Sequence, residues 1–328
     1  MKKLLVLGLT IVLLATLFLG CSKKQEVTTI QLNEVTHSVF YAPLYAALEL
    51  GFFAEENLNV ELTNGGGADK VMTAVLAGQA DIGFAGPEAC LYVLNEGRED
   101  YPVIFAQLTK RDGSFLVGRT DEDFKWENLK GKTIIGGRKG GVPEMTLEYV
   151  MRQNGVIPNV DAVVDTSIQF NMMAGAFTGG SSDYVTLFEP IATEVELEGK
   201  GYVLTSIGQE SGEIPYTAFF ASQSYIKKNP ATIQNFTNAV ARGQKWVQEH
   251  SAEEIAKAIV DQFPSTELDV LTLVAQRYKD IDAWNETPVM KQESLERLET
   301  VMETAGELDK RVDFNKLVDN SFAEKTSK

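Results

Sequence analysis

The sequence predicts an α/β protein built from two successive α/β units and a helical C-terminal region. Strand-like segments alternate with segments of helical period through residues 29–108, and the alternation restarts near residue 132. Such alternation favours mostly parallel sheets. Length points the same way: setting aside 20 N-terminal residues of the 328 leaves 308, which suits two lobes of roughly 100–200 residues each.

The N-terminus has the pattern of an export signal. Lys2 and Lys3 precede an apolar run of 16 residues, 4–19, which is short of the ~20 that a spanning helix needs. Residues 18–21, Phe-Leu-Gly-Cys, resemble the bacterial lipobox, although Phe stands where Leu is usual. We therefore expect a signal peptide over 1–20, a palmitate-type lipid on Cys21, a tether over 21–29 and a location outside the cytoplasm on the bacterial cell membrane. The alternative is an uncleaved anchor with an incidental cysteine.

Charge and cysteine content exclude several classes of protein. Without Lys2 and Lys3, 28 basic residues face 46 acidic ones, a net charge of −18, which argues against nucleic acid as a partner. Once Cys21 is acylated, Cys90 is the only thiol, so neither an internal disulfide nor a cysteine metal site is expected. His37 has no nearby histidine to share a metal, and no cofactor is expected.

The elements of the two units follow from their periodicity. In the first unit we expect strands over 29–35, 58–62, 81–85 and 103–108, and helices over 43–53, 69–76 and 87–94. In the second we expect strands over 132–136, 162–164, 183–187 and 201–204, and a helix over 143–153. Gly51 should interrupt the first helix near its end. From Pro230 the chain reads as helical, with breaks at Pro264 and Pro288, and these helices should return to brace the first unit.

Five segments resemble one family of proteins. Residues 35–53, which include Tyr-Ala-Pro-Leu-Tyr-Ala-Ala-Leu-Glu-Leu-Gly-Phe-Phe, resemble the opening of substrate-binding proteins of ABC importers. The subgroup contains the nitrate, sulfonate and taurine binders and the binders of thiamine-pyrimidine precursors. Residues 58–67, 75–83, 128–134 and 318–322 match later segments of the same family in the same order.

The resemblance implies a type II periplasmic-binding-protein fold, in which two α/β lobes joined by a two-strand hinge close on a ligand. The first lobe would comprise residues 30–114 and 216–328, including the helical tail, and the second lobe residues 115–215. We expect the crossovers near 114–116 and 215–217. The expected partners are a small-molecule solute and the permease subunits with their cytoplasmic ATPase, and the protein is expected to be a monomer.

Candidate ligand-binding residues follow from the rule that ligands lie beyond the carboxyl ends of parallel strands. In the first lobe these positions hold Thr36, His37, Ser38, Tyr41, Gly66, Gly67, Gly86 and Glu88. Ser38 could equally cap the next helix, the glycines could serve only as turns, and Glu88 suits a first helical turn on its own.

The corresponding loop of the second lobe bears on the charge of the ligand. Gly141 could offer an amide to a ligand at the start of a helix, but Pro143 has no amide hydrogen and Glu144 would repel an anion. Arg138 and Lys139 compensate only in part. This composition lowers our preference for a sulfonate or nitrate.

A planar, polar organic ligand fits the remaining candidates better. Glu189 at a strand end could accept hydrogen bonds from ring NH or amino groups, as in the thiamine-precursor binders that this segment resembles. Phe188, Tyr41 and Tyr216 could stack on the ring, and Asn171 is a weaker candidate. The alternative is that Phe188 belongs to the core and Glu189 caps a surface helix.

The sequence thus predicts a lipid-anchored, extracytoplasmic substrate-binding component of an ABC importer, specific for a heterocycle similar to a thiamine precursor. The first alternative is an anion binder for sulfonate, taurine or nitrate. A ligand-sensing lipoprotein and an enzyme similar to the fungal pyrimidine synthase are further alternatives. No nucleophile elbow, zinc motif or Ser-His-Asp order supports an enzyme.

Overall fold

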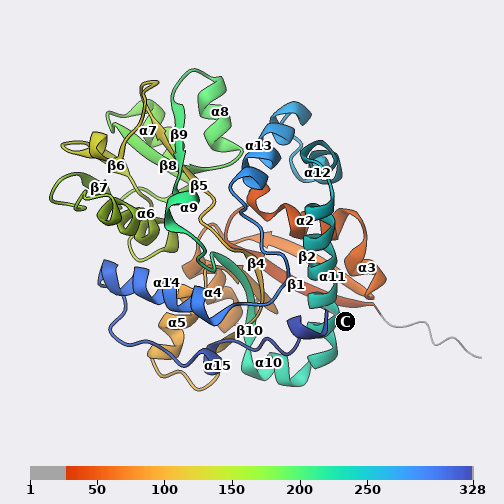
Figure 1. Ribbon diagram of the computed structural model, residues 1–328. Coiled ribbons are helices and arrows are strands. Elements are labelled where there is room, and N and C mark those ends of the chain that lie inside the picture. Colours follow the sequence, from red (N-terminus) through yellow and green to blue (C-terminus); the bar gives the residue numbers. More distant parts are fainter. Residues whose placement is uncertain (1–26, 327–328) are drawn as a thin grey trace, which may run out of the picture.

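The computed structural model describes residues 27–326, so the expected signal peptide, Cys21 and most of the tether lie outside the described residues. Two five-stranded sheets form the centres of two lobes (Figure 1). The first sheet has the order β2-β1-β3-β10-β4, with bounds β1 Thr28–Glu34, β2 Leu58–Asn64, β3 Ile82–Ala85, β4 Pro102–Thr109 and β10 Thr217–Ser222.

The first sheet is mixed, with parallel and antiparallel neighbours. β1 is parallel to β2 and β3, and β10 is antiparallel to β3 and β4. β1 begins at Thr28, whose amide donates to the Asn57 carbonyl at 2.9 Å, so the strand starts inside the segment expected to be tether.

Helices of the first lobe follow the strands. They are η1 Val39–Tyr41, α2 Ala42–Glu49, α3 Phe52–Glu55, α4 Ala68–Leu76 and α5 Glu88–Asn95. The helix expected over 43–53 is two helices, because Gly51 between them has φ 77°, a left-handed conformation that a glycine adopts without steric cost. The interruption at Gly51 is therefore confirmed, and it ends the helix completely.

The second lobe holds the other sheet, in the order β7-β6-β8-β5-β9. Its elements are β5 Ser114–Gly118, η2 Trp126–Leu129, β6 Thr133–Ile135, α6 Val142–Gln153, β7 Val163–Asp165, η3 Phe170–Met172, α7 Met173–Gly179, β8 Tyr184–Phe188, α8 Ile191–Leu197, β9 Tyr202–Ser206 and α9 Ile207–Ser211. β6 is parallel to β7 and β8, and β5 is antiparallel to β8 and β9. Both sheets therefore combine a parallel part with antiparallel strands, and together they make the fold of periplasmic binding proteins.

The chain passes between the sheets twice, at residues 110–113 after β4 and at residues 207–216 before β10. The two passages pack closely. A Cβ atom on Gly208 would lie 2.1 Å from the carbonyl oxygen of Asp112, so only glycine fits there. The Asp112 carboxylate is buried and accepts hydrogen bonds from the amide and the hydroxyl of Ser114, both at 2.6 Å.

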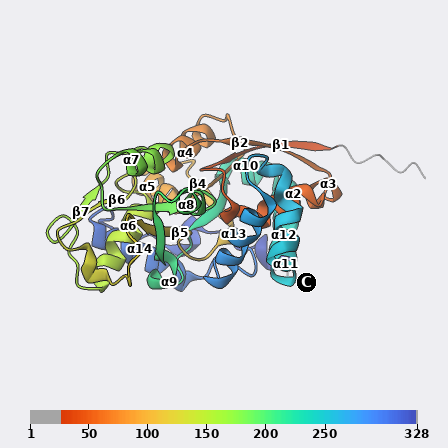
Figure 2. The same cartoon turned by 90° about the horizontal axis from the view of Figure 1, so that it is seen from above.

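The C-terminal region is helical and braces the first lobe, as expected. Its helices are α10 Gln223–Lys228, α11 Pro230–Glu249, α12 Ala252–Ile259, η4 Val260–Gln262, α13 Leu268–Asp280, α14 Gln292–Ala305, α15 Phe314–Leu317 and η5 Ala323–Lys325. Pro264 and Pro288 both lie between helices. α11 packs along α2, while α13 and α14 reach the second lobe at α8 and α6 (Figures 1 and 2).

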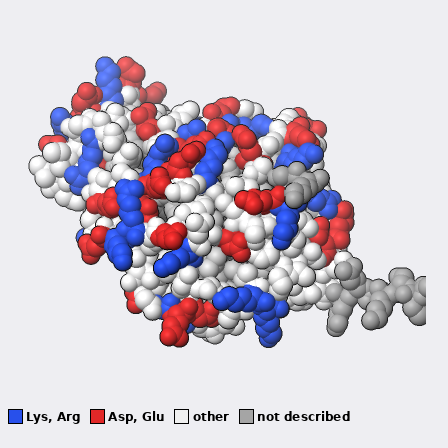
Figure 3. All heavy atoms as spheres, turned by 60° about the horizontal axis from the view of Figure 1, so that its bottom comes forward, with Lys and Arg blue, Asp and Glu red and all other residues white. Residues whose placement is uncertain are grey.

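Charged side chains are mixed on the molecular surface. On the face shown in Figure 3, basic and acidic groups are interspersed and neither sign forms a continuous patch. Among the described helices, none combines the length and apolar character that crossing a bilayer requires.

Candidate functional site

A cavity of about 90 Å³ lies between the two lobes, at the carboxyl ends of the parallel strands of both sheets. Its first-lobe wall comes from the segments after β1, β2 and β3 and from the start of β10. Its second-lobe wall comes from the segments after β6 and β7 and from the end of β8. The lining residues that the sequence predicted are Thr36, Tyr41, Gly66, Gly67, Gly86, Glu88, Gly141, Phe188 and Tyr216.

One wall of the cavity is aromatic. The ring centroids of Phe188 and Tyr216 are 6.1 Å apart, and Phe40 behind them is 5.7 Å from each. Tyr41 joins this group at 5.4 Å from Phe40, and Phe170 lies 5.5 Å from Phe188. Tyr41, Phe170, Phe188 and Tyr216 line the cavity itself, and such an aromatic lining suits a planar ligand.

Glu88 is a buried acidic group of the cavity. Its residue is only 2 % exposed, and its Oε2 atom has no hydrogen-bond partner. Burial raises the pKa of Glu88 to about 7, against the opposing effects of its own backbone amide and of Arg138. The carboxylate folds back over Gly86, where a Cβ atom would meet Oε2 at 1.9 Å. Gly86 therefore makes room for the carboxylate.

Two cations stand at the exposed rim. Arg138 and Lys70 both line the cavity, and the nearest acid to Arg138 is Asp69, whose Oδ1 lies 3.9 Å from Nε. Gly66 and Gly67 bring the chain into α4 with φ values of 70° and 153°, which glycine alone adopts readily. The rim thus carries positive charge, while the interior holds the Glu88 carboxylate.

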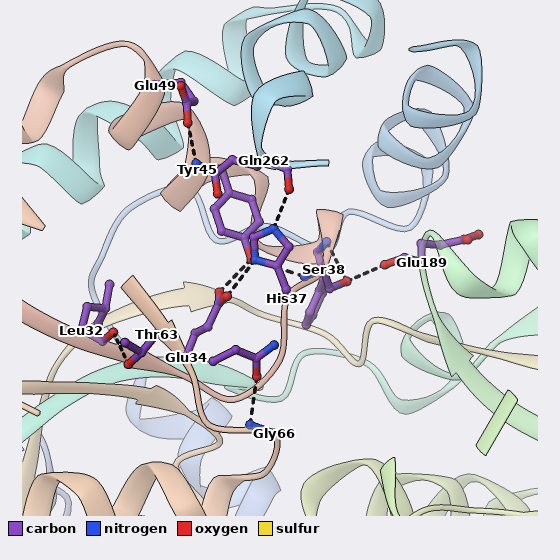
Figure 4. Close-up of polar contacts among 12 residues, drawn as sticks. Leu32, Glu34, His37, Ser38, Tyr45, Glu49, Thr63, Gly66, Glu189 and Gln262 are labelled. Atoms are coloured by element: carbon purple, nitrogen blue, oxygen red, sulfur yellow. Dashed lines mark hydrogen bonds and ion pairs between the residues drawn. The ribbon is translucent and has the colours of Figure 1, made fainter. Parts of the chain in front are cut away.

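His37 lies beside the site but is already fully bonded (Figure 4). Its Nδ1 is 2.8 Å from Oε1 of Glu34, and its Nε2 is 2.9 Å from the carbonyl oxygen of Gln262. Both of these neighbours are acceptors, which favours the doubly protonated ring, and the Tyr45 hydroxyl lies 3.1 Å from Nδ1 as well. The pKa of His37 is accordingly raised. Burial lowers this pKa, but the hydrogen bond and charge of Glu34, together with the Gln262 carbonyl, raise it by more. Both ring nitrogens are thus engaged, so an N–H donated to a ligand would have to replace one of these bonds; the ligand-binding role of His37 stays a prediction.

Ser38 and Glu189 connect the lobes instead of pointing at the main cavity. Ser38 caps η1 by accepting from the Phe40 amide at 3.2 Å, and its hydroxyl donates to the Glu189 carbonyl at 2.6 Å (Figure 4). The Glu189 carboxylate accepts from the amide and hydroxyl of Thr193, at 2.8 and 2.9 Å, and from Arg277 Nη1 at 2.8 Å. Since Arg277 belongs to α13, this carboxylate forms an ion pair across the lobes.

The remaining predicted residues do not line the main cavity. A smaller neighbouring cavity of about 40 Å³ is lined in part by His37, Ser38, Asn171 and Glu189. Glu144 lines neither cavity, because its carboxylate turns back to accept from the Gly140 amide at 3.1 Å. The expected repulsion between Glu144 and a ligand is thus replaced by a bond within its own loop.

Sequence reasoning missed several lining residues, namely Gln169, Phe170, Met173, Thr186 and Thr217. Thr186 could have been found, because it stands two residues before Phe188 on β8 and shares its face of the strand. Arg277 carried no local signal. Within residues 27–326, no group of three or more His, Cys, Asp or Glu side chains is arranged to hold a metal ion.

Solved structures with a similar fold include binding proteins and an enzyme. The alkanesulfonate-binding protein SsuA from Xanthomonas axonopodis pv. citri, bound to MOPS, is similar with a TM-score of 0.72, 15% identity and coverage of 89% of this chain and 98% of that one. The nitrate-binding protein NrtA from Synechocystis PCC 6803 is similar with a TM-score of 0.71 and 17% identity, and the match covers 92% of this chain and 89% of NrtA. The desulfurization enzyme DSZB is similar with a TM-score of 0.64 and 13% identity, and the match covers 92% of this chain and 99% of DSZB. At these identities the similarity shows the fold.

Sequence comparison gives the family. YtlA of Bacillus subtilis (strain 168), which is named as a candidate binding protein, is 44% identical over 309 residues, covering 94% of this chain and 92% of YtlA. The NMT1/THI5-like family model matches residues 39–254, which include η1, the whole second lobe and every residue that lines the main cavity except Val35 and Thr36. The chain therefore belongs to the NMT1/THI5-like family.

Proposed function

We propose that this protein is the substrate-binding component of an ABC importer and that it captures a small organic solute between its lobes. The observation that carries the proposal is the cavity itself, which both lobes build at their strand ends and which buried aromatic side chains line. The sulfonate- and nitrate-binding proteins with the same fold, and a relative named for binding, support it.

For the solute we propose a planar heterocycle similar to a thiamine precursor. The rings of Tyr41, Phe188 and Tyr216 support a flat ligand, and Glu88 supports one with N–H groups. A sulfonate or nitrate is the second candidate, because Arg138 and Lys70 stand at the rim. The interior argues against it, since an anion would share the cavity with a buried carboxylate.

Thermal unfolding of the purified protein with a panel of solutes tests this proposal. The panel contains aminopyrimidines, nucleobases, flavins, aliphatic sulfonates, taurine and nitrate. A solute at 100 times its dissociation constant adds about 2.7 kcal/mol of stability, a readable shift in Tm. We expect heterocycles to give the shift; a shift with sulfonates alone would favour the second candidate, and none at all would contradict solute binding.

Two matched substitutions locate the binding site. Phe188→Leu removes a ring from the cavity wall, whereas Phe53→Leu removes a ring that is 3 % exposed and lies in α3, away from the cavity. Both should lower the Tm of the solute-free protein, but only Phe188→Leu should reduce the shift that the solute produces. Equal loss in both variants would place the solute elsewhere.

We also propose that Cys21 carries a lipid that holds the protein outside the cytoplasm at the membrane. The basic start, the short apolar run and the cysteine at its end support this. Cys21→Ser should move the protein from the membrane fraction to the soluble fraction of cells or medium. Retention in the membrane would favour an uncleaved anchor.

A further inference from the structure

We propose that Glu88 selects solutes with a cationic N–H group, which pairs with the Oε2 atom inside the cavity. The inference deepens the proposed solute binding and rests on it. It names a chemical class, a small planar cation, and one specificity-determining residue.

One oxygen of the Glu88 carboxylate has no hydrogen-bond partner within the protein. Glu88 begins α5, and its own amide and the Val142 amide at the start of α6 both stabilise its negative charge. The Oε2 atom nevertheless has no hydrogen-bond partner, is buried and belongs to a residue of the cavity wall. In the part of the chain that the structure describes, no ion pair joins Glu88 to a Lys, Arg or His.

An unpaired buried acceptor favours a particular ligand. A bound N–H donor would complete the bonding of Oε2, and a positive charge on that donor would offset the burial of the carboxylate. An anion at the same place would add a second buried negative charge. The aromatic wall adds attraction for a flat cation, because ring faces carry negative potential.

Other buried glutamates of the site are already paired. Glu189 is bonded to Thr193 and Arg277, and Glu144 is bonded to the Gly140 amide. Among these three described carboxylates, only Glu88 lines the main cavity. Asp69 also lines this cavity, but its side chain is exposed at the rim beside Arg138. Glu88 is therefore the buried acid that a bound solute would meet.

The surroundings of Glu88 predict how affinity depends on pH. Burial raises the pKa of Glu88, and Arg138, from the β6–α6 loop, lowers it in part. In addition to burial, the Glu88 charge in turn raises the pKa of four neighbours, which are Tyr41 in η1, Cys90 and Tyr92 in α5, and Tyr216 in the second passage. Burial raises the pKa of the tyrosines and of the thiol, so they stay neutral below pH 8.5. Near them, Asp112 and Glu144 also have pKa values of about 7 but lie outside the main cavity wall. A cation should bind the ionised form of Glu88, so its affinity should rise between pH 5.5 and 8.5.

Calorimetric titration of the full-length protein with two planar probes tests the inference. The probes are 4-aminopyridine, a cation at neutral pH, and benzenesulfonate, an anion. We compare the wild type with Glu88→Gln and with Glu299→Gln, a control that replaces another buried glutamate, in α14, bonded to the Val312 amide at 2.8 Å. The thermal unfolding of each variant shows that it is folded.

We expect 4-aminopyridine to bind the wild type and Glu299→Gln alike, more tightly at pH 8.5 than at 5.5. Glu88→Gln should bind it about 10- to 100-fold more weakly, the range for a hydrogen bond to a charged group, and should lose the pH dependence. Unchanged affinity in Glu88→Gln overturns the inference, as does tighter binding of benzenesulfonate by the wild type. If neither probe binds, Glu88 does not select planar cations, whereas a shift with any member of the solute panel would still uphold solute binding.

Discussion

Replacing Glu88 by glutamine should stabilise the solute-free protein above about pH 5, although it changes a fully buried residue. Glutamine has nearly the same shape and no charge. The wild-type carboxylate has to ionise in an apolar cavity with one oxygen unpaired, whereas the amide carries no such burden. If Glu88→Gln is more stable than the wild type, Glu88 serves binding at the expense of stability; if the variant is less stable, Glu88 stabilises the fold.

The size of the effect follows from the pKa. Burial raises the pKa of Glu88 from 4.5 to about 7 in the folded protein. Between these values the folded state binds more protons than the unfolded state, so the free energy of unfolding falls as pH rises. At about 1.36 kcal/mol per pH unit, the wild type should lose about 3 kcal/mol between pH 4.5 and 7 relative to Glu88→Gln.

Urea unfolding of both proteins at pH 4, 5.5, 7 and 8.5 measures this difference directly. The raised pKa values of Asp112 and Glu144 affect both proteins equally and cancel in the comparison. Glu293→Gln, at an exposed position of α14, is the control for the loss of a glutamate carboxylate. A difference between wild type and Glu88→Gln that is constant across the range would refute the reasoning, because Glu88 would then not titrate.

Three further predictions concern the contacts around the site. His37→Asn should lower Tm most below pH 6.5, and the loss should shrink as pH rises through the raised pKa of His37; a loss that grows with pH would contradict the assignment of an imidazolium. Arg277→Met leaves the Glu189 charge buried without its partner and should cost about 3–5 kcal/mol in urea unfolding. The double variant Arg277→Met/Glu189→Gln should recover part of that loss, and no recovery would rule out the ion pair. Gly208→Ala should destabilise the protein by roughly 1–3 kcal/mol, because its Cβ atom would overlap the Asp112 carbonyl; a neutral effect would show that the passages are loosely packed.

Periodicity predicted most of the fold because most elements have one buried face. The helix at α4 buries Val71, Met72 and Val75 on one side, and β1 alternates buried and partly exposed residues. β5 and the first five residues of β10 are buried on both faces, so their sequences show no alternation. Periodicity therefore predicted neither strand, and only the two-strand hinge implied by the family resemblance, with crossovers near 114–116 and 215–217, pointed to them.

The strand-end rule located the cavity but could not assign the acids within it. Glu189 does end a strand, yet its charge is matched by Arg277, 88 positions away in the sequence. The second proton of His37 depends on the Gln262 carbonyl, 225 positions away. Glu88 differs because no described side chain comes to pair with it, and sequence spacing cannot show the absence of a distant partner.

We expect a bound solute to supply only part of the free energy that brings the lobes together, because other contacts already join them. On one side of the cavity, Tyr92 donates to the Gly140 carbonyl at 2.9 Å; on the other, Arg277 bonds Glu189 and Ser38 donates to the Glu189 carbonyl. These bonds join the lobes without involving the main cavity, so they favour closure whether or not a solute is present. Apparent affinity depends on the fraction of protein that can adopt the binding form. We therefore propose that contacts outside the cavity set how tightly a solute is held, while Glu88 and the aromatic wall determine which solute binds.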